Sequence, residues 1–275
     1  MALFPVSFAL YRDQMGLGPW AIISVTAVTL KRGEPGSRET RLFCVRVLLI
    51  SDIHSNLEAL EEVLNHASFD EVLFMGDLVD YGPNPFEVFE ILQYVRAKRV
   101  LGNHDAAAAF KTDCRSSSVM HEASVVTRER ITWRQMPAKP LEVLGKAGKE
   151  LQIDYGGVNV RAFHAAPDDR LYRYITKEEA AQMDMKGADL VVLGHTHVPY
   201  EVKRQGVWVV NPGSVGMPKD GDPRASYATL DTASRNVTFG RVEYDIEEVA
   251  AELGDLLREH EDVFELIAKT LRSGQ

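Results

Sequence analysis

The sequence is poor in cysteine and contains no long apolar run. Only Cys44 and Cys114 occur among its 275 residues, which excludes a disulfide framework and favours a reducing, cytoplasmic location. The longest apolar stretch, residues 20–30, is shorter than the roughly 20 residues that span a bilayer. The acidic residue Asp13 lies before this stretch, where a signal peptide is basic. We therefore expect neither a membrane segment nor export.

Positive charge is also scarce. The chain has 31 Lys and Arg residues against 40 Asp and Glu residues, which gives a formal net charge of −9. Non-specific nucleic-acid binding depends on many cationic contacts to phosphates, so we expect no stable nucleic-acid partner. A small anionic substrate is compatible with this balance, because bound metal ions would make a single site locally positive.

Regular hydrophobic patterning is missing from residues 1–44. This segment ends in a polar stretch, residues 31–41, that contains two glycines and a proline. We expect it to be disordered or to be a wrongly assigned extension, with Val45 as the true start, read as methionine. A genuine flexible arm or a targeting segment is the alternative. Residues 45–275 are expected to form the working domain.

From position 45 onwards, apolar strands alternate with amphipathic helices. Strands are predicted at residues 45–50, 71–75 and 99–101. Ser55 with Glu58 fits a helix capping box, and Asn84 with Pro85 fits an N-cap followed by the first helical residue. This order of elements predicts an α/β fold in which helices cover both faces of a parallel sheet.

Residues 106–150 interrupt this alternation, because they are mainly helical, and we expect a cap beside the candidate site here. A charged run within the cap is predicted to be a solvated helix face rather than a substrate clamp; it consists of Arg128, Glu129, Arg130 and Arg134. Strand patterns then return with a hairpin around Gly156 and Gly157. A last helix is predicted from Asp245 to Arg272.

Five polar clusters each follow a predicted strand directly. They comprise Asp52 and His54; Asp77; Asn103, His104 and Asp105; His164; and His195 and His197. Sites in open α/β sheets form at the carboxyl ends of strands, and burying five such clusters without partners would cost much free energy. The set combines carboxylate, imidazole and amide ligands and lacks thiolate. It therefore favours an open catalytic site for Mn²⁺, Fe, Co²⁺, Ni²⁺ or Zn²⁺ over a structural zinc site.

The order of these motifs resembles that of the calcineurin-like metallophosphoesterase superfamily. The series along the chain is Asp-x-His, Gly-Asp, Gly-Asn-His-Asp, His and Gly-His-x-His. Residues 50–56, 76–82 and 211–214 resemble the small prokaryotic phosphodiesterase branch of that superfamily. The resemblance covers residues 45–230. It implies an α/β fold of the α+β sandwich type, in which a metal-bearing β-sandwich has helices on both outer faces and, here, a small helical cap at residues 106–150.

The resemblance also implies two divalent metal ions as cofactors, with manganese as the favoured metal. One ion would take Asp52, His54, Asp77 and His197, and the second would take Asp77, Asn103, His164 and His195. Asp77 is then the bridging carboxylate. His104 is the implied catalytic histidine that faces the leaving group, and Asp105 would orient it.

Four further residues are open to two interpretations each. Arg170, Tyr172 and Arg173 would contact a substrate phosphate or would be ordinary residues of a surface loop. Asp80 would either form a hydrogen bond to a ligand histidine or stabilise a turn.

Together these features predict hydrolysis of a small phosphate ester, with a phosphodiester as the favoured substrate. Two neighbouring ions would clamp the phosphoryl group and generate a hydroxide for in-line attack on phosphorus. Phosphomonoesters and nucleotide pyrophosphates are the alternative substrates. A different class of function is also open, because the retromer scaffold subunit resembles this fold but uses it to bind proteins. The complete ligand set and His104 favour the enzyme, and self-association into a homo-oligomer is left open.

Overall fold

The computed structural model describes residues 44–204 and 206–275. The expectations for residues 1–44 fall outside this part of the chain, except for Cys44 itself, which is exposed. Within the described residues, no helix has both the length and the apolar character needed to cross a membrane.

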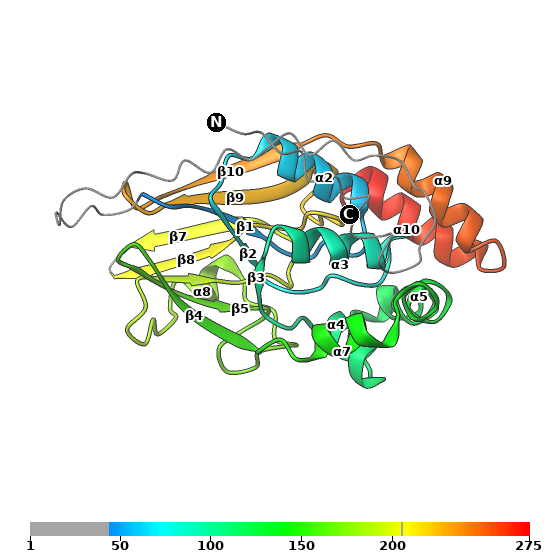
Figure 1. Ribbon diagram of the computed structural model, residues 1–275, viewed down its shortest axis with the longest axis horizontal. Helices are drawn as coiled ribbons and strands as arrows, with labels where there is room; N and C mark the ends of the chain where they lie inside the picture. Colours follow the sequence, from blue (N-terminus) through cyan, green and yellow to red (C-terminus); the bar gives the residue numbers. More distant parts are fainter. Residues whose placement is uncertain (1–43, 205) are drawn as a thin grey trace, which may run out of the picture. The chain divides into compact units, whose positions relative to one another are not determined.

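Two five-stranded sheets of mixed direction pack as a sandwich (Figure 1). The first has the order β10-β9-β1-β2-β3 and is formed by β1 (Arg46–Ile50), β2 (Glu71–Phe74), β3 (Lys98–Arg99), β9 (Ala225–Asp231) and β10 (Asn236–Val242). The second has the order β4-β5-β6-β8-β7 and is formed by β4 (Glu150–Tyr155), β5 (Val158–Phe163), β6 (Leu190–Val192), β7 (Tyr200–Arg204) and β8 (Val207–Asn211).

Strand direction follows the connections between strands. Strands β1, β2 and β3 are parallel to one another, as are β5, β6 and β8, while the remaining neighbouring pairs are antiparallel. The β-sandwich implied by the family resemblance is therefore confirmed. The single parallel sheet predicted from the strand–helix alternation is wrong, because the later strands form a second layer rather than extending the first.

The apolar run of β1 is buried on both sides, which explains why it shows no alternation with polar residues. Val47 and Leu49 point into the core between the two sheets. Leu48 and Ile50 point the other way, into a second core beneath the helices. Both faces of β1 therefore pack against apolar side chains, and the burial of both faces stabilises the strand between the two cores.

Helices α2 (Leu57–His66) and α3 (Pro85–Tyr94) cover the outer face of the first sheet (Figure 1). The predicted capping box of Ser55 and Glu58 is wrong. Asn56 is the N-cap and accepts the Ala59 N–H at 3.1 Å, because Ser55 is needed in a tight turn at φ 55°, where its N–H donates to the Leu78 carbonyl.

The predicted helical stretch between β3 and β4 is confirmed in its general character. It contains α4 (Asn103–Phe110), α5 (Ser118–Thr127), the π-helix η1 (Arg128–Thr132), α6 (Trp133–Gln135) and α7 (Ala138–Gly145). The short helix α8 (Lys177–Ala180) lies later, between β5 and β6.

The single helix expected from Asp245 to Arg272 is wrong, because the chain forms a hairpin of α9 (Ile246–Leu256) and α10 (Glu261–Ser273). Asp245 caps α9 as expected, accepting the Glu248 N–H at 2.9 Å. The break lets both helices bury apolar residues in one cluster with Met120 of α5. The C-terminal hairpin thus anchors the helical insertion beside the strand ends.

Candidate metal centre

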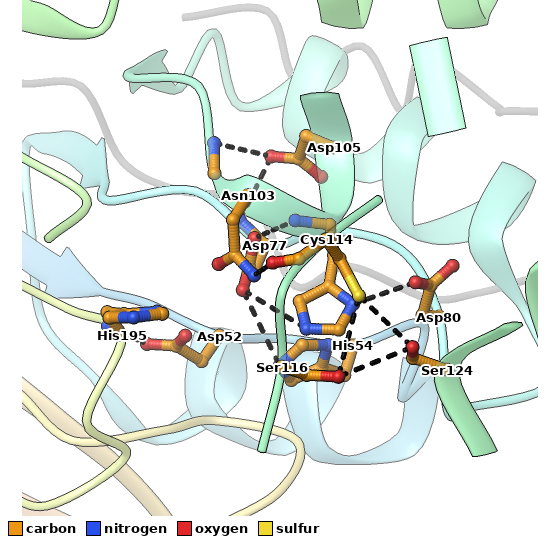
Figure 2. A network of polar contacts seen from close by, with 12 residues as sticks. Asp52, His54, Asp77, Asp80, Asn103, Asp105, Cys114, Ser116, Ser124 and His195 are labelled. Carbon is orange, nitrogen blue, oxygen red and sulfur yellow. Dashed lines mark hydrogen bonds and ion pairs between the residues drawn. The ribbon is translucent and has the colours of Figure 1, made fainter. Parts of the chain in front are cut away.

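The seven predicted ligand residues meet where β1, β2, β5 and β6 end and α4 begins. Figure 2 shows five of them, Asp52, His54, Asp77, Asn103 and His195. All seven are at most 4% exposed; they are Asp52, His54, Asp77, Asn103, His164, His195 and His197. Main-chain hydrogen bonds join the strand ends, for example from Asp52 N–H to the Gly76 carbonyl at 3.0 Å and from Gly194 N–H to the His164 carbonyl at 2.8 Å. The turns that carry the ligands are therefore tied to one another directly.

Five of the ligands lie in a backbone conformation that residues with a side chain rarely adopt. Their positive φ angles are 53° at Asp52, 48° at His54, 61° at Asp77, 66° at His195 and 59° at His197. Such conformations cost free energy and persist where the surrounding structure imposes them, often at functional sites. The close approach of the Asp77 turn requires glycine at Gly102, since a Cβ there would lie 2.1 Å from an Asp77 carboxylate oxygen.

The ligand atoms form two clusters. In the first, His197 Nε2 lies 3.3 Å from His54 Nε2 and 3.4 Å from Asp52 Oδ1. In the second, His164 Nε2 lies 3.2 Å from both Asp77 Oδ2 and His195 Nδ1. Within each of these groups of three, the ligand atoms all lie within 4.8 Å of one another.

Asn103 completes the second cluster. Its Nδ2 donates to the Cys114 carbonyl at 2.7 Å, which turns its Oδ1 toward His164 Nε2 at 2.8 Å. The amide oxygen, rather than the amide nitrogen, thus faces the other ligand atoms, as metal binding requires.

The carboxylate of Asp77 lies between the two clusters. Its Oδ2 is 3.2 Å from His164 Nε2 and 3.9 Å from His54 Nε2. Its Oδ1 accepts the His104 main-chain N–H at 2.9 Å, which fixes the orientation of the group. One oxygen of Asp77 therefore faces both clusters.

Each ligand histidine is held by a hydrogen bond from its second ring nitrogen to a main-chain carbonyl. His54 Nδ1 donates to Val79 at 2.9 Å, His164 Nδ1 to Met75 at 2.7 Å, His197 Nδ1 to Met217 at 2.6 Å and His195 Nε2 to Tyr172 at 3.1 Å. Since the carbonyl can only accept, the proton is placed on that nitrogen, and the lone pair of the other nitrogen faces the cluster. Metal-binding histidines have this arrangement.

These residues fit two divalent cations. Ligand atoms at roughly 2.0–2.2 Å from a transition-metal ion lie about 3–3.5 Å apart, which matches the separations in both clusters. Asp52 Oδ1 is buried without any hydrogen-bond donor, and burial raises the pKa of Asp52 to about 7. A cation at this position would supply the missing partner of that oxygen.

The protonation states of the ligand histidines also fit two bound cations. Burial lowers the pKa of His54 and of His195 to about 3, so both rings are neutral and able to bind a metal near neutral pH. Burial also opposes the charging of His164, but the nearby carboxylate of Asp77 outweighs it and raises the pKa of His164 to about 9. A metal ion shared with Asp77 would take the place of that proton.

His104 lies beside the clusters without belonging to either. Its Nδ1 donates to Asp80 Oδ2 at 2.7 Å, and its Nε2 lies 4.0 Å from Asp77 Oδ2. Burial opposes protonation here too, but the carboxylates of Asp77 and Asp80 prevail and raise the pKa of His104 to about 10. Of the two interpretations of Asp80, the hydrogen bond to a histidine holds, although that histidine is His104 and not a ligand.

The expectation that Asp105 orients His104 is not met. The Asp105 carboxylate accepts main-chain N–H groups from Asp77 at 2.9 Å, Leu78 at 2.8 Å and Gly102 at 3.2 Å. Asp105 is the third residue of α4 and folds back to the helix start, as in a capping box. It therefore holds the Asp77 turn, as the positions of Asp105 and Asp77 in Figure 2 show. Asp80, instead, contacts the His104 ring.

The prediction of a solvated charged face is wrong for Arg128. This residue is 3% exposed and forms an ion pair with Asp80. It starts the π-helical turn η1, and Thr132 at the end of that turn also lies 3.4 Å from Asp80. Turns of this kind inside α-helices are frequent at functional sites. The helical stretch between β3 and β4 thus reaches the site through Arg128.

The three loop residues predicted as substrate contacts have other partners. Arg170 forms an ion pair with Glu150 at 2.9 Å, and Arg173 pairs with both Asp168 and Glu179. The Tyr172 carbonyl accepts from His195 as described above, and its ring carries the Arg115 guanidinium at 4.6 Å. Contact of these side chains with a substrate remains a prediction.

Two residues near the site escaped the sequence-based prediction. The Tyr174 ring lies 4.2 Å from the His195 ring, centroid to centroid. Lys219 donates its main-chain N–H to the His197 carbonyl at 3.3 Å. Lys219 follows the Asn-Pro-Gly-Ser motif by five residues, and this proximity is the signal that could have found it.

Fold and site together define a protein with paired His and Asp clusters for metal ions at the edge of a two-sheet sandwich. The chain matches the Calcineurin-like phosphoesterase superfamily domain over residues 45–235. A Methanocaldococcus jannaschii protein is 31% identical over 221 residues, which are 73% of this chain and 88% of the relative. Phosphodiesterase YfcE of Escherichia coli K12 is 26% identical over 200 residues, 68% of this chain and 88% of YfcE.

A solved structure agrees with these sequence relatives. The crystal structure of a metallophosphoesterase from Sphaerobacter thermophilus has a TM-score of 0.70 and 32% sequence identity, covering 84% of this chain and 100% of that one. The chain belongs to the calcineurin-like phosphoesterase superfamily. It is a metal-dependent hydrolase of phosphoric esters, related to small phosphodiesterases of the YfcE type.

Proposed function

We propose that this protein hydrolyses phosphodiesters with two divalent metal ions, manganese being the favoured metal. The observation that carries the proposal is the orientation of the four ligand histidines, whose free ring nitrogens converge because main-chain carbonyls hold the other ones. The name of the relative YfcE supports the choice of a diester. Residues 45–275 would form the catalytic domain, with residues 106–150 as its cap.

The ligands divide between the ions according to the two clusters. The first ion would be held by Asp52, His54, Asp77 and His197, and the second by Asp77, Asn103, His164 and His195. When bound, the two ions supply Lewis acidity, which offsets the charge of the phosphate and lowers the pKa of water at the site. Asp77 would bridge them, because its Oδ2 faces both clusters.

His104 is proposed to act on the leaving group. Asp80 holds the proton at Nδ1, so the Nε2 edge, which faces Asp77 and the clusters, is the one left to meet a substrate. A proton at Nε2 would stabilise the negative charge that develops on the leaving oxygen or pass to it. Arg128 pairs with the same oxygen of Asp80 and keeps that carboxylate in place.

Lys219 is proposed as a cation for the non-bridging phosphate oxygens. Its main-chain N–H donates to the His197 carbonyl at 3.3 Å. Burial lowers the pKa of its ammonium, and the carboxylates of Asp52 and Asp77 oppose that shift. Within the described part of the chain it forms no close ion pair with a carboxylate. An ammonium placed in this way is suited to a phosphate that approaches the two clusters.

The proposal is tested with purified protein, stripped of metal and then supplied with Mn²⁺, Co²⁺ or Ni²⁺. We expect chelation to abolish the hydrolysis of bis(p-nitrophenyl) phosphate and each metal to restore it. Diesters should be turned over faster than p-nitrophenyl phosphate or nucleotide pyrophosphates. A metal-loaded protein that is inactive on every ester of such a panel would refute the proposal and favour a protein-binding scaffold.

A further inference from the structure

An aromatic side chain lies exposed beside a metal ligand. Tyr174, in the segment between β5 and α8, is 47% exposed. Its ring lies 4.2 Å from the His195 ring at an interplanar angle of 32°. Among the described residues, His195 is the one ring in contact with it. One side of the tyrosine is therefore covered by a ligand of the second cluster, while a large part of its surface remains in water.

The contact with His195 places the Tyr174 ring beside the second cluster. Burial, together with the charges of Asp77, Asp52 and Cys114, raises the pKa of the Tyr174 hydroxyl. A group attached to a phosphate that is held at the clusters would lie within reach of it.

The same connecting segment carries a second aromatic ring, that of Tyr172. The guanidinium of Arg115 lies 4.6 Å from the centre of the Tyr172 ring. Arg115 follows Cys114, whose carbonyl orients the ligand Asn103. Its guanidinium has no carboxylate partner in the described ranges 44–204 and 206–275. We name residues 111–117 and 165–176 the rim of the site.

We propose that the exposed face of Tyr174 is a stacking platform for a planar aromatic group of the substrate, so that the enzyme prefers aryl or nucleoside phosphoesters over alkyl ones. This inference rests on the proposed function, since a phosphate must be held at the clusters for the ring to reach Tyr174. Aromatic rings stack favourably at centroid separations of about 4.5–7 Å, and an exposed tyrosine offers such a surface with little loss of side-chain entropy.

Two phosphonates that differ only in the ring provide the test. Phenylphosphonate and methylphosphonate present the same head group to the metal ions and are not hydrolysed. Titration calorimetry with the full-length, Mn²⁺-loaded protein measures the Kd of each. We expect phenylphosphonate to bind about fivefold more tightly. Tyr174→Phe should keep this ratio, and Tyr174→Ala should bring it close to one.

The controls separate stacking from a structural role. Tyr174 packs against His195, so Tyr174→Ala can weaken both phosphonates alike, and only the ratio reports stacking. Tyr174→Leu keeps an apolar side chain against His195 without a ring and should also bring the ratio of the two Kd values close to one. Phe110→Ala removes another exposed aromatic residue, on α4, and should retain the parent's ratio of Kd values. Metal content is measured for every variant.

The outcomes distinguish this inference from the function on which it rests. An equal Kd for both phosphonates in the parent, or a parent-like ratio in both Tyr174→Ala and Tyr174→Leu, overturns the stacking platform and leaves the proposed function standing. Failure of the metal-loaded parent to bind either phosphonate overturns both.

Discussion

The ligand floor of the site and its rim are built in different ways. The floor consists of the seven ligand residues, which lie at strand ends and at the start of α4 and are at most 4% exposed. The rim consists of connecting segments with exposed side chains such as Tyr174 and Arg173. Rigid elements hold groups to within the tolerance that catalysis needs, whereas loops vary more freely. We infer that the floor determines the reaction and that the rim selects the ester.

The substitution Asp77→Asn should produce the largest effect, because it changes the centre of the floor. The amide keeps the shape of the side chain but removes the negative charge that faces both His54 and His164. We expect the binding of both ions to weaken and kcat to fall by about 10³-fold or more. Mass spectrometry of the metal content and initial rates measure the two effects.

His197→Ala provides the comparison for Asp77→Asn, since His197 belongs to the first cluster alone. It should leave one ion per chain. Asp255→Asn makes the same chemical change at an exposed residue of α9 and should leave both ions in place. If Asp77→Asn retained the metal content of the parent, a shared position for Asp77 would be excluded.

His104→Ala tests a residue that touches the floor without being a ligand. We expect it to keep both ions and to lose turnover by about 10²–10⁴-fold, the usual range for general acid–base catalysis. The loss should shrink for esters with better leaving groups, which need less help from an acid. A loss of equal size across a leaving-group series would argue for a positioning role. His121→Ala, at a side chain of α5 that is 41% exposed, should behave like the parent.

Arg128→Met should have a smaller effect on turnover and a clear effect on stability. It removes the cation from the buried carboxylate of Asp80, and breaking a buried ion pair costs about 3 kcal/mol or more. We expect a lower Tm, unchanged metal content and a kcat reduced by about tenfold, because Asp80 would hold His104 less firmly. Arg128→Lys should recover part of the Tm and part of kcat. An unchanged Tm in Arg128→Met would contradict a structural ion pair.

The floor could be predicted from the sequence because its signal is local. Each ligand follows the end of a strand by one to five residues, and parallel strands bring their carboxyl ends to one edge. The family resemblance supplied the division into two clusters. The two-sheet arrangement could not be derived from periodicity, because an apolar strand does not reveal which strand lies next to it.

The contacts around His104 could not be predicted in the same way. Asp80 and Arg128 are 48 positions apart in the chain, and no local pattern links them. Arg128 also starts a π-helical turn, in which the spacing of 3.6 residues per turn that defines a helix face no longer holds. Asp105 was assigned wrongly because its neighbour His104 suggested a contact, whereas its place in the first turn of α4 directs it to main-chain N–H groups.

The smallest effect is expected at the rim, for Arg173→Ala. This arginine was predicted as a substrate contact, but its guanidinium already pairs with Asp168 and Glu179 in an exposed position. Exposed ion pairs contribute little to stability, so Tm should hardly change. We expect KM for bis(p-nitrophenyl) phosphate to rise by less than about threefold. Lys219→Met serves as the comparison, since Lys219 forms no close ion pair within the described residues and adjoins His197. Its KM should rise by about tenfold, the usual scale for a lost charged contact to phosphate. A tenfold rise in KM for Arg173→Ala with kcat unchanged would show that the arginine leaves its carboxylates to bind substrate, and the rim would then take part in holding the phosphate as well as in selecting the ester.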